Sequence, residues 1–216
     1  MLQGPSFIPQ TTKNALILFH GYGADGSDLF SLSYELREHF KEMAFFTPNA
    51  PSITYGGGYE WFSLDDYFEK QSLGTEYLNE LKKRAEPLIN ITEEYIQQIE
   101  KTLNLKRENI FVGGFSQGGL IASLTALSSK SAFNGLVLMS PVPITQVRKD
   151  APKFPILLTR GLEDSVIPPQ AQELTKPVFQ NAGYEITEDI DALMGHGISE
   201  QNLNSIINFI AKNIKN

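Results

Sequence analysis

Short apolar runs recur along the chain, and each one is followed by residues that favour turns. The runs are rich in Ile, Val, Leu and Phe and cover residues 15–19, 43–47, 110–113, 136–139 and 156–159. A run of this length without polar alternation is typical of a strand that is buried on both faces of a parallel sheet. We therefore predict buried strands at these positions, with a further strand around residues 186–190.

Apolar residues with helical spacing lie between these runs. They form three sets: Ile91, Tyr95, Ile99 and Leu103; Leu120, Leu124 and Leu127; and Leu203, Ile206, Ile207 and Ile210. Strands that alternate with helices predict an α/β fold, in which a mostly parallel sheet has helices on both faces. In such a sheet, ligands bind at the carboxyl ends of the strands.

The segment over residues 51–70 departs from this alternation. Three consecutive glycines are followed there by aromatic residues: Tyr59, Trp61, Phe62, Tyr67 and Phe68. We interpret this segment as a mobile, aromatic-rich loop. The chain has no internal repeat and no low-complexity linker, so we expect one domain over residues 1–216.

Charge and composition exclude several classes of protein. The 25 acidic and 18 basic residues give a net charge of −7, which disfavours binding to a nucleic acid. Residues 1–12 lack the features of a signal peptide, and no stretch comes near the roughly 18 apolar residues of a membrane span. We therefore expect a cytoplasmic protein. The absence of cysteine excludes disulfides, zinc–thiolate sites and cysteine nucleophiles.

A G-x-S-x-G motif spans residues 114–118 and places Ser116 between two glycines. Small flanking residues permit the strained turn from strand to helix, the nucleophile elbow, that exposes a serine hydroxyl. An apolar run precedes the motif and a helical pattern follows it over residues 118–127. This context favours Ser116 as a nucleophile over an inert serine in a glycine-rich turn.

A serine nucleophile needs a base, and histidine has a suitable pKa near neutral pH. His39 lies in a polar helical stretch, and His20 ends a strand but precedes the serine. His196 lies between two glycines, after the last predicted strand and before the final helix. We predict that His196 is the base; a structural loop histidine is the alternative.

The acid of a catalytic triad is expected at a strand end, between the serine and the histidine in chain order. Asp164 follows the apolar run at residues 156–159 and fits this position. Glu163 is its close rival, and a plain solvated carboxylate in a turn is a further alternative. For the oxyanion hole we predict the backbone N–H groups of Gln117, which follows the nucleophile, and of Tyr22, in the loop after an early strand.

The same early loop contains glycines with the G-x-G-x-x-G spacing of a dinucleotide site, over residues 21–26. No acidic residue ends the next strand to bind a ribose, and Asp25 and Asp28 would place negative charge where the pyrophosphate should bind. A metal site built from His20 and these two aspartates is disfavoured further, because hydrolytic metal sites usually combine several histidines or carboxylates.

Taken together, these motifs resemble the phospholipase/carboxylesterase family of small α/β-hydrolases, which includes the acyl-protein thioesterases. The matching pieces are LFHGYGAD at 18–25, PNAP at 48–51, WF at 61–62, GFSQGG at 114–119, GLED at 161–164 with VIP at 166–168, and GHGI at 195–198. Tyr22 stands where leucine is common in the family, and Ser63 stands where aspartate is frequent. Since the oxyanion contact uses backbone, the first departure should change substrate preference and leave the chemistry intact.

The resemblance implies an α/β-hydrolase fold without a large cap domain, no cofactor and no metal. It implies hydrolysis of small carboxyl esters, acyl thioesters or lysophospholipids, with acylated proteins as further candidate substrates. We expect either a monomer or a homodimer, between which the sequence does not decide. It also suggests that Tyr59, Trp61, Phe62 and Val166 contact the substrate. Core packing of Trp61 and Phe62 is the alternative, and a non-catalytic ligand-binding module on the same fold is the rival function.

Overall fold

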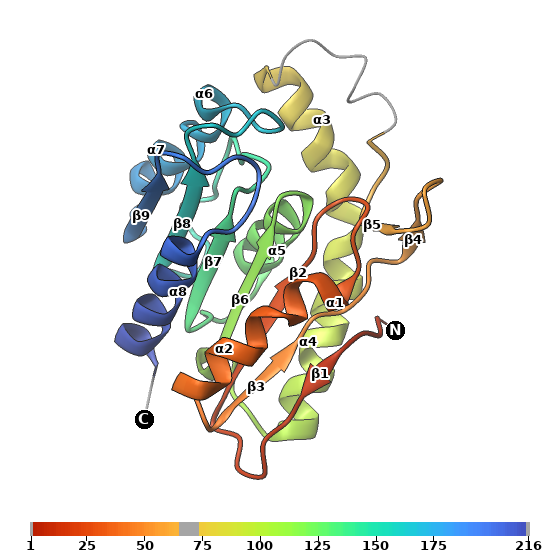
Figure 1. The fold of residues 1–216 in the computed structure, drawn as a ribbon, viewed down its shortest axis with the longest axis vertical. Coiled ribbons are helices and arrows are strands. Elements are labelled where there is room, and N and C mark those ends of the chain that lie inside the picture. Colours follow the sequence, from red (N-terminus) through yellow and green to blue (C-terminus); the bar gives the residue numbers. More distant parts are fainter. Residues whose placement is uncertain (1, 65–73, 215–216) are drawn as a thin grey trace.

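The protein is built around one mostly parallel β-sheet, seen in the computed structural model, which describes residues 2–64 and 74–214 (Figure 1). In this part of the chain seven strands form the sheet. In spatial order they are β1 (Ser6–Phe7), β3 (Met43–Phe46), β2 (Asn14–Phe19), β6 (Ile110–Phe115), β7 (Gly135–Met139), β8 (Ile156–Gly161) and β9 (Ile186–Asp191). The predicted strands are confirmed, and each lies within a few residues of its expected position.

The strand order contains a switch point between β2 and β6. From β2 the chain moves to one side to form β3, and the later strands β6 to β9 are added on the other side of β2. All neighbouring strands of the sheet are parallel except β1, which pairs antiparallel with β3. Connections that leave in opposite directions open a crevice at the carboxyl ends of β2 and β6, where α/β proteins bind ligands.

Helices cover both faces of the sheet (Figure 1). One face is covered by α1 (Gly26–Phe30), α2 (Leu32–His39) and α8 (Glu200–Asn213). The other is covered by α3 (Thr75–Ala85), α4 (Ile89–Leu103), α5 (Gln117–Ser128) and α7 (Thr175–Asn181). The remaining helical elements are short: α6 (Pro169–Gln172) and the 3₁₀ turns η2 (Glu86–Leu88) and η3 (Arg107–Asn109).

Alternate residues of the strands supply the two cores. In β2, Leu16 and Leu18 pack against the face that carries α1, α2 and α8, whereas Ile17 and Phe19 pack against the other face. Helix α5 is buried along nearly its whole length, because it lies between the sheet and the helices α3 and α4. A strand or helix that is buried on all sides needs the continuous apolar sequence that these elements have.

The segment at residues 51–70 is only partly a loop. It contains a small antiparallel hairpin of β4 (Ser52–Ile53) and β5 (Tyr59–Glu60). Tyr67 and Phe68 lie outside the described residues, so the predicted mobility of the segment stays a prediction. Within residues 2–64 and 74–214 there is no large cap over the sheet, and no helix there combines the length and apolar character needed to cross a bilayer.

Candidate active site

Ser116 occupies a strained turn between β6 and α5. Its backbone has φ 53° and ψ −116°, a conformation that L-residues rarely adopt and that costs free energy. The turn requires glycine at positions 114 and 118, because any β carbon there would collide with nearby backbone. A β carbon at Gly114 would come 2.3 Å from the carbonyl oxygen of Gly118, and one at Gly118 would come 2.0 Å from that of Phe19. The G-x-S-x-G motif therefore forms the strand–turn–helix that we predicted.

His196 lies in the loop between β9 and α8, where its ring packs against Phe115. The two ring centroids are 4.7 Å apart, so the imidazole lies beside the residue that precedes Ser116. Nδ1 of His196 is 2.8 Å from Oδ2 of Asp164. Because an ionised carboxylate only accepts hydrogen bonds, Nδ1 donates the proton, and Nε2 is left with the lone pair that a base needs.

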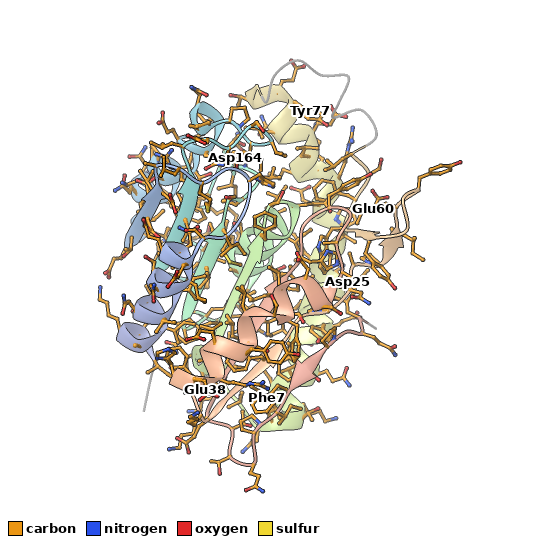
Figure 2. The ribbon with its side chains drawn as sticks, in the orientation of Figure 1. Phe7, Asp25, Glu38, Glu60, Tyr77 and Asp164 are labelled. Carbon is orange, nitrogen blue, oxygen red and sulfur yellow. The ribbon has the colours of Figure 1, made fainter. Side chains whose placement is uncertain are left out.

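Asp164 lies just beyond the carboxyl end of β8 (Figure 2), and several donors bind its carboxylate. Its side chain is buried, and Oδ1 accepts the backbone N–H groups of Val166 at 2.9 Å and Ile167 at 2.8 Å. Oδ2 accepts from His196 and from Nε2 of Gln172, which is 2.7 Å away. Sequence reasoning missed Gln172, since no motif marks a glutamine eight residues after the acid.

Glu163, the rival for the acid, points elsewhere. Its side chain is exposed, and its backbone N–H donates to the carbonyl oxygen of Met194. The carboxylate that reaches the imidazole is that of Asp164.

The loop after β2 brings a second backbone segment against Ser116. A β carbon at Gly21 would come 3.4 Å from Cβ of Ser116 and 3.0 Å from the ring of Phe115, so only glycine fits here without displacing its neighbours. Tyr22 follows and lines the same cavity as Ser116. Gln117, which follows Ser116, is the first residue of α5, where backbone N–H groups have no intrahelical acceptor.

His20 is a structural residue of this loop. Nδ1 lies 2.7 Å from the carbonyl oxygen of Gly21, and Nε2 accepts the N–H of Ala50 at 3.0 Å. Both ring nitrogens are thus engaged, with the proton on Nδ1. Burial lowers the pKa of His20, although the hydrogen bond to Gly21 and the charges of Asp25 and Asp28 oppose this effect. His39 is exposed, 3.6 Å from Glu35, which agrees with its interpretation as a surface residue.

The N-terminus of α1 is already occupied by groups of the chain itself. Oδ1 of Asp25 accepts the N–H of Ser27 at 2.7 Å, and Oδ1 of Asn49 accepts the N–H of Gly26 at the same distance. A pyrophosphate would have to displace both, which argues against the dinucleotide alternative. Over residues 2–64 and 74–214, no cluster of three histidine or acidic residues is arranged to bind a metal ion.

Ser116 and His196 line one cavity of about 270 Å³. Its apolar wall consists of Leu64, Leu81, Phe115, Val142, Val166 and Ile167. Tyr22, Ala24 and Asp28 line the side toward the early loop. Of the four residues expected to contact substrate, Val166 is part of this wall.

Tyr59, Trp61 and Phe62 do not line this cavity. Trp61 is only 2% exposed, and its Nε1–H donates to the carbonyl oxygen of His20 at 2.9 Å. The side chain of Gln117 holds the same segment, because Oε1 accepts the N–H of Trp61 at 2.9 Å and Nε2 donates to the carbonyl oxygen of Phe62 at 2.7 Å. Core packing, the alternative for Trp61 and Phe62, is the arrangement observed, and Leu64 is the residue of this segment that faces the cavity.

Comparison with known proteins agrees with the geometry. The family model of phospholipase/carboxylesterase matches residues 9–214. Acyl-protein thioesterase 1 from Gibberella zeae is 24% identical over 97% of this chain and 95% of its own length. Its counterpart from Eremothecium gossypii is 28% identical over 95% of this chain and 90% of its own.

Solved structures give the same result. The crystal structure of esterase PE8 superimposes with a TM-score of 0.88 at 28% identity, over 98% of this chain and 99% of the esterase. A carboxylesterase from Bacillus cereus, at 19% identity, has a TM-score of 0.76 over 98% of this chain and 94% of its own. The α/β-hydrolase fold that we predicted is therefore confirmed.

Proposed function

The chain is an ester or thioester hydrolase of the phospholipase/carboxylesterase family, and from this premise we propose that Ser116, His196 and Asp164 form its catalytic triad. One observation carries the proposal. The strained serine and a histidine whose tautomer is fixed by a buried carboxylate line the same apolar cavity. This is the arrangement that activates a serine hydroxyl toward a carbonyl carbon.

In the first step, Nε2 of His196 takes the proton of the Ser116 hydroxyl as Oγ attacks the carbonyl carbon of the substrate. The protonated imidazole is stabilised by Asp164, to which it donates through Nδ1. The imidazolium then gives its proton to the departing alcohol or thiol as the carbon–oxygen or carbon–sulfur bond breaks. The product of this step is an acyl ester of Ser116.

The oxygen of the tetrahedral intermediate carries a negative charge, which the backbone N–H groups of Tyr22 and Gln117 are proposed to stabilise. Their support is positional: Gln117 begins α5, whose dipole favours negative charge at its N-terminus, and Tyr22 lines the same cavity as Ser116. Such donors are among the largest contributions to catalysis of acyl transfer.

In the second step, His196 takes a proton from water as the water oxygen attacks the acyl carbon. The intermediate collapses, Ser116 leaves with the proton from the imidazolium, and the carboxylic acid product departs. In both steps the chain supplies the base and the proposed oxyanion donors, and water is the second substrate. The apolar wall of the cavity suits the acyl chain, so we propose carboxyl esters, acyl thioesters and lysophospholipids as substrates, and acylated proteins as further candidates.

A fluorophosphonate probe tests the proposal, since it reacts with activated serines. We expect labelling of the wild type, loss of labelling in Ser116→Ala, and retention in Ser123→Ala, a control that removes a buried serine from the helix α5 that follows Ser116. Turnover of p-nitrophenyl and thioester substrates should fall by at least about 10⁴-fold in Ser116→Ala and His196→Ala. Equal turnover in the Ser116→Ala variant, or no labelling of the wild type, would overturn the proposal and favour a ligand-binding module.

The same assays, run over a panel of graded acyl length, would define the substrate class. The expectations of a cytoplasmic location, of one domain and of a monomer or homodimer stay predictions from the sequence.

A further inference from the structure

Gln172 contacts the carboxylate that orients His196, although it belongs to none of the motifs of the sequence. We propose that Gln172 is a positioning residue: it fixes Oδ2 of Asp164 in the line of the imidazole and sets how strongly that oxygen attracts the protonated ring. This inference rests on the proposed function, because it assigns His196 the role of base.

The amide orientation of Gln172 follows from its two partners. Nε2 lies 2.7 Å from Oδ2 of Asp164 and 2.8 Å from the carbonyl oxygen of Ile167. Both partners are acceptors, so the group between them must be the NH₂ and not the carbonyl of the amide. Gln172 is 1% exposed, and water therefore cannot substitute for it readily.

The backbone around Gln172 is restrained, which limits where its side chain can lie. Pro168 precedes α6 and Pro169 is its first residue, so both restrict the backbone there, and the N–H of Gln172 donates to the carbonyl oxygen of Pro168 at 3.1 Å. The loop that begins at Asp164 thus returns to it, with the two ends joined by the Gln172 amide. A supporting hydrogen bond of this kind helps to fix the rotamer of the carboxylate.

With Gln172 in place, the carboxylate of Asp164 accepts four hydrogen bonds, two on each oxygen. A carboxylate offers about four such acceptor positions, so its set is complete. Oδ2 accepts hydrogen bonds from both the amide of Gln172 and the imidazole of His196, so its negative charge is partly compensated by the amide. Without the amide, Oδ2 would be less firmly held, and its full charge would act on the imidazole and favour the protonated ring.

Removal of the donor is therefore expected to change two separable quantities. Looser placement of Asp164 should lower kcat by about tenfold, with KM within about twofold of wild type, because orientation affects the chemical step. Stronger attraction of the protonated imidazole should move the acid-side midpoint of the kcat/KM profile upward by about half a pH unit. A residue that only supports packing would lower activity equally at all pH values.

The variants are Gln172→Met, which keeps the unbranched shape without a donor, and Gln172→Asn, whose shorter amide falls short of Oδ2 and keeps the site polar. Gln201→Met is the matched control. Nε2 of Gln201 also donates to a carboxylate and a backbone carbonyl, those of Asp189 and Ile190, but on the exposed surface of α8. We expect both Gln172 variants to show the kcat loss and the upward shift, and the control to show neither.

A measurement on the wild type covers the case in which neither variant folds. The side-chain ¹⁵N resonance of Gln172 is expected to shift as His196 is protonated, with the same midpoint as the acid limb of activity. An unshifted profile in folded Gln172 variants, or a resonance that does not respond to His196, would overturn the inference. Failure of the proposed function would look different, because the wild type would then not react with a fluorophosphonate, whatever Gln172 does.

Discussion

Gly161, the last residue of β8, lies directly beneath the carbonyl oxygen of Met194, two residues before His196. A β carbon at Gly161 would come 1.9 Å from that oxygen. Since the atoms in its way belong to the backbone, the backbone itself would have to move. We expect Gly161→Ala to displace the loop that carries His196 and to lower kcat/KM by about 100-fold, since a shift of about 1 Å is enough for such a loss. Steady-state kinetics with a p-nitrophenyl ester measures this.

Gly195→Ala is the matched control for that experiment. A β carbon there would be 3.7 Å from the carbonyl oxygen of Glu163, an ordinary van der Waals contact. We expect its kcat/KM within about twofold of wild type, although it is adjacent to the proposed base. Similar losses in the two variants would contradict the steric explanation.

Burial of His20 predicts a dependence of stability on pH. Its pKa in the folded protein is lowered from the ordinary 6.5, mainly by desolvation. As the pH falls below about 6.5, the unfolded chain binds a proton before the folded protein does, so the free energy of unfolding decreases. Thermal unfolding from about pH 7.5 to 5.5 should show this decrease, and His20→Gln should reduce its slope by up to about 1.4 kcal/mol per pH unit. An unchanged slope in the His20→Gln variant would contradict this explanation.

Trp61→Phe separates the two interpretations of Trp61. The variant removes the indole N–H that donates to the buried carbonyl oxygen of His20, and we expect a loss of about 1–3 kcal/mol in the free energy of unfolding. Because Trp61 does not line the cavity, the preference for acyl length should be unchanged. Denaturant unfolding and the acyl-length panel test both parts. A changed acyl-length preference with unchanged stability would indicate a substrate contact instead.

The negative charge of Asp28 at the cavity predicts that cationic substrates are favoured over anionic ones. Among the described residues that line the cavity, it is the only acidic one, and its side chain is exposed. Asp28→Asn should raise kcat/KM for anionic thioesters relative to cationic ones by about 3–10-fold at low ionic strength, and salt should reduce the difference. Asp150→Asn, an exposed acidic residue that does not line the cavity, is the control and should leave the ratio unchanged.

The sequence was informative wherever one physical requirement fixed the residue type. The strands β2, β6, β7 and β8 are buried on both faces, so their continuous apolar runs identified them. The elbow at Ser116 needs small neighbours, and the glycines revealed it. The structure also brings Asp164 and His196, 32 residues apart, within hydrogen-bonding distance, as the chain order of the fold predicts.

Pairwise contacts between distant segments could not be inferred in the same way. Trp61 and Phe62 resemble pocket residues in the sequence, yet both are buried, and their backbone is hydrogen-bonded to the side chain of Gln117, more than 50 residues away. The burial of Gln172 could not be predicted, because a single polar residue in a short helix is usually expected to face solvent. Its contact with Asp164 is apparent only from the structure, in which the loop that starts at Asp164 brings Gln172 back to that carboxylate.

The backbone of Ser116 has a further consequence for how this protein can change. Glycine tolerates a positive φ, so Ser116→Gly should relieve part of a strain that costs about 1–3 kcal/mol while it removes the hydroxyl. At this position a gain in stability would therefore come with the loss of the proposed nucleophile, so stability and activity place opposite demands on Ser116.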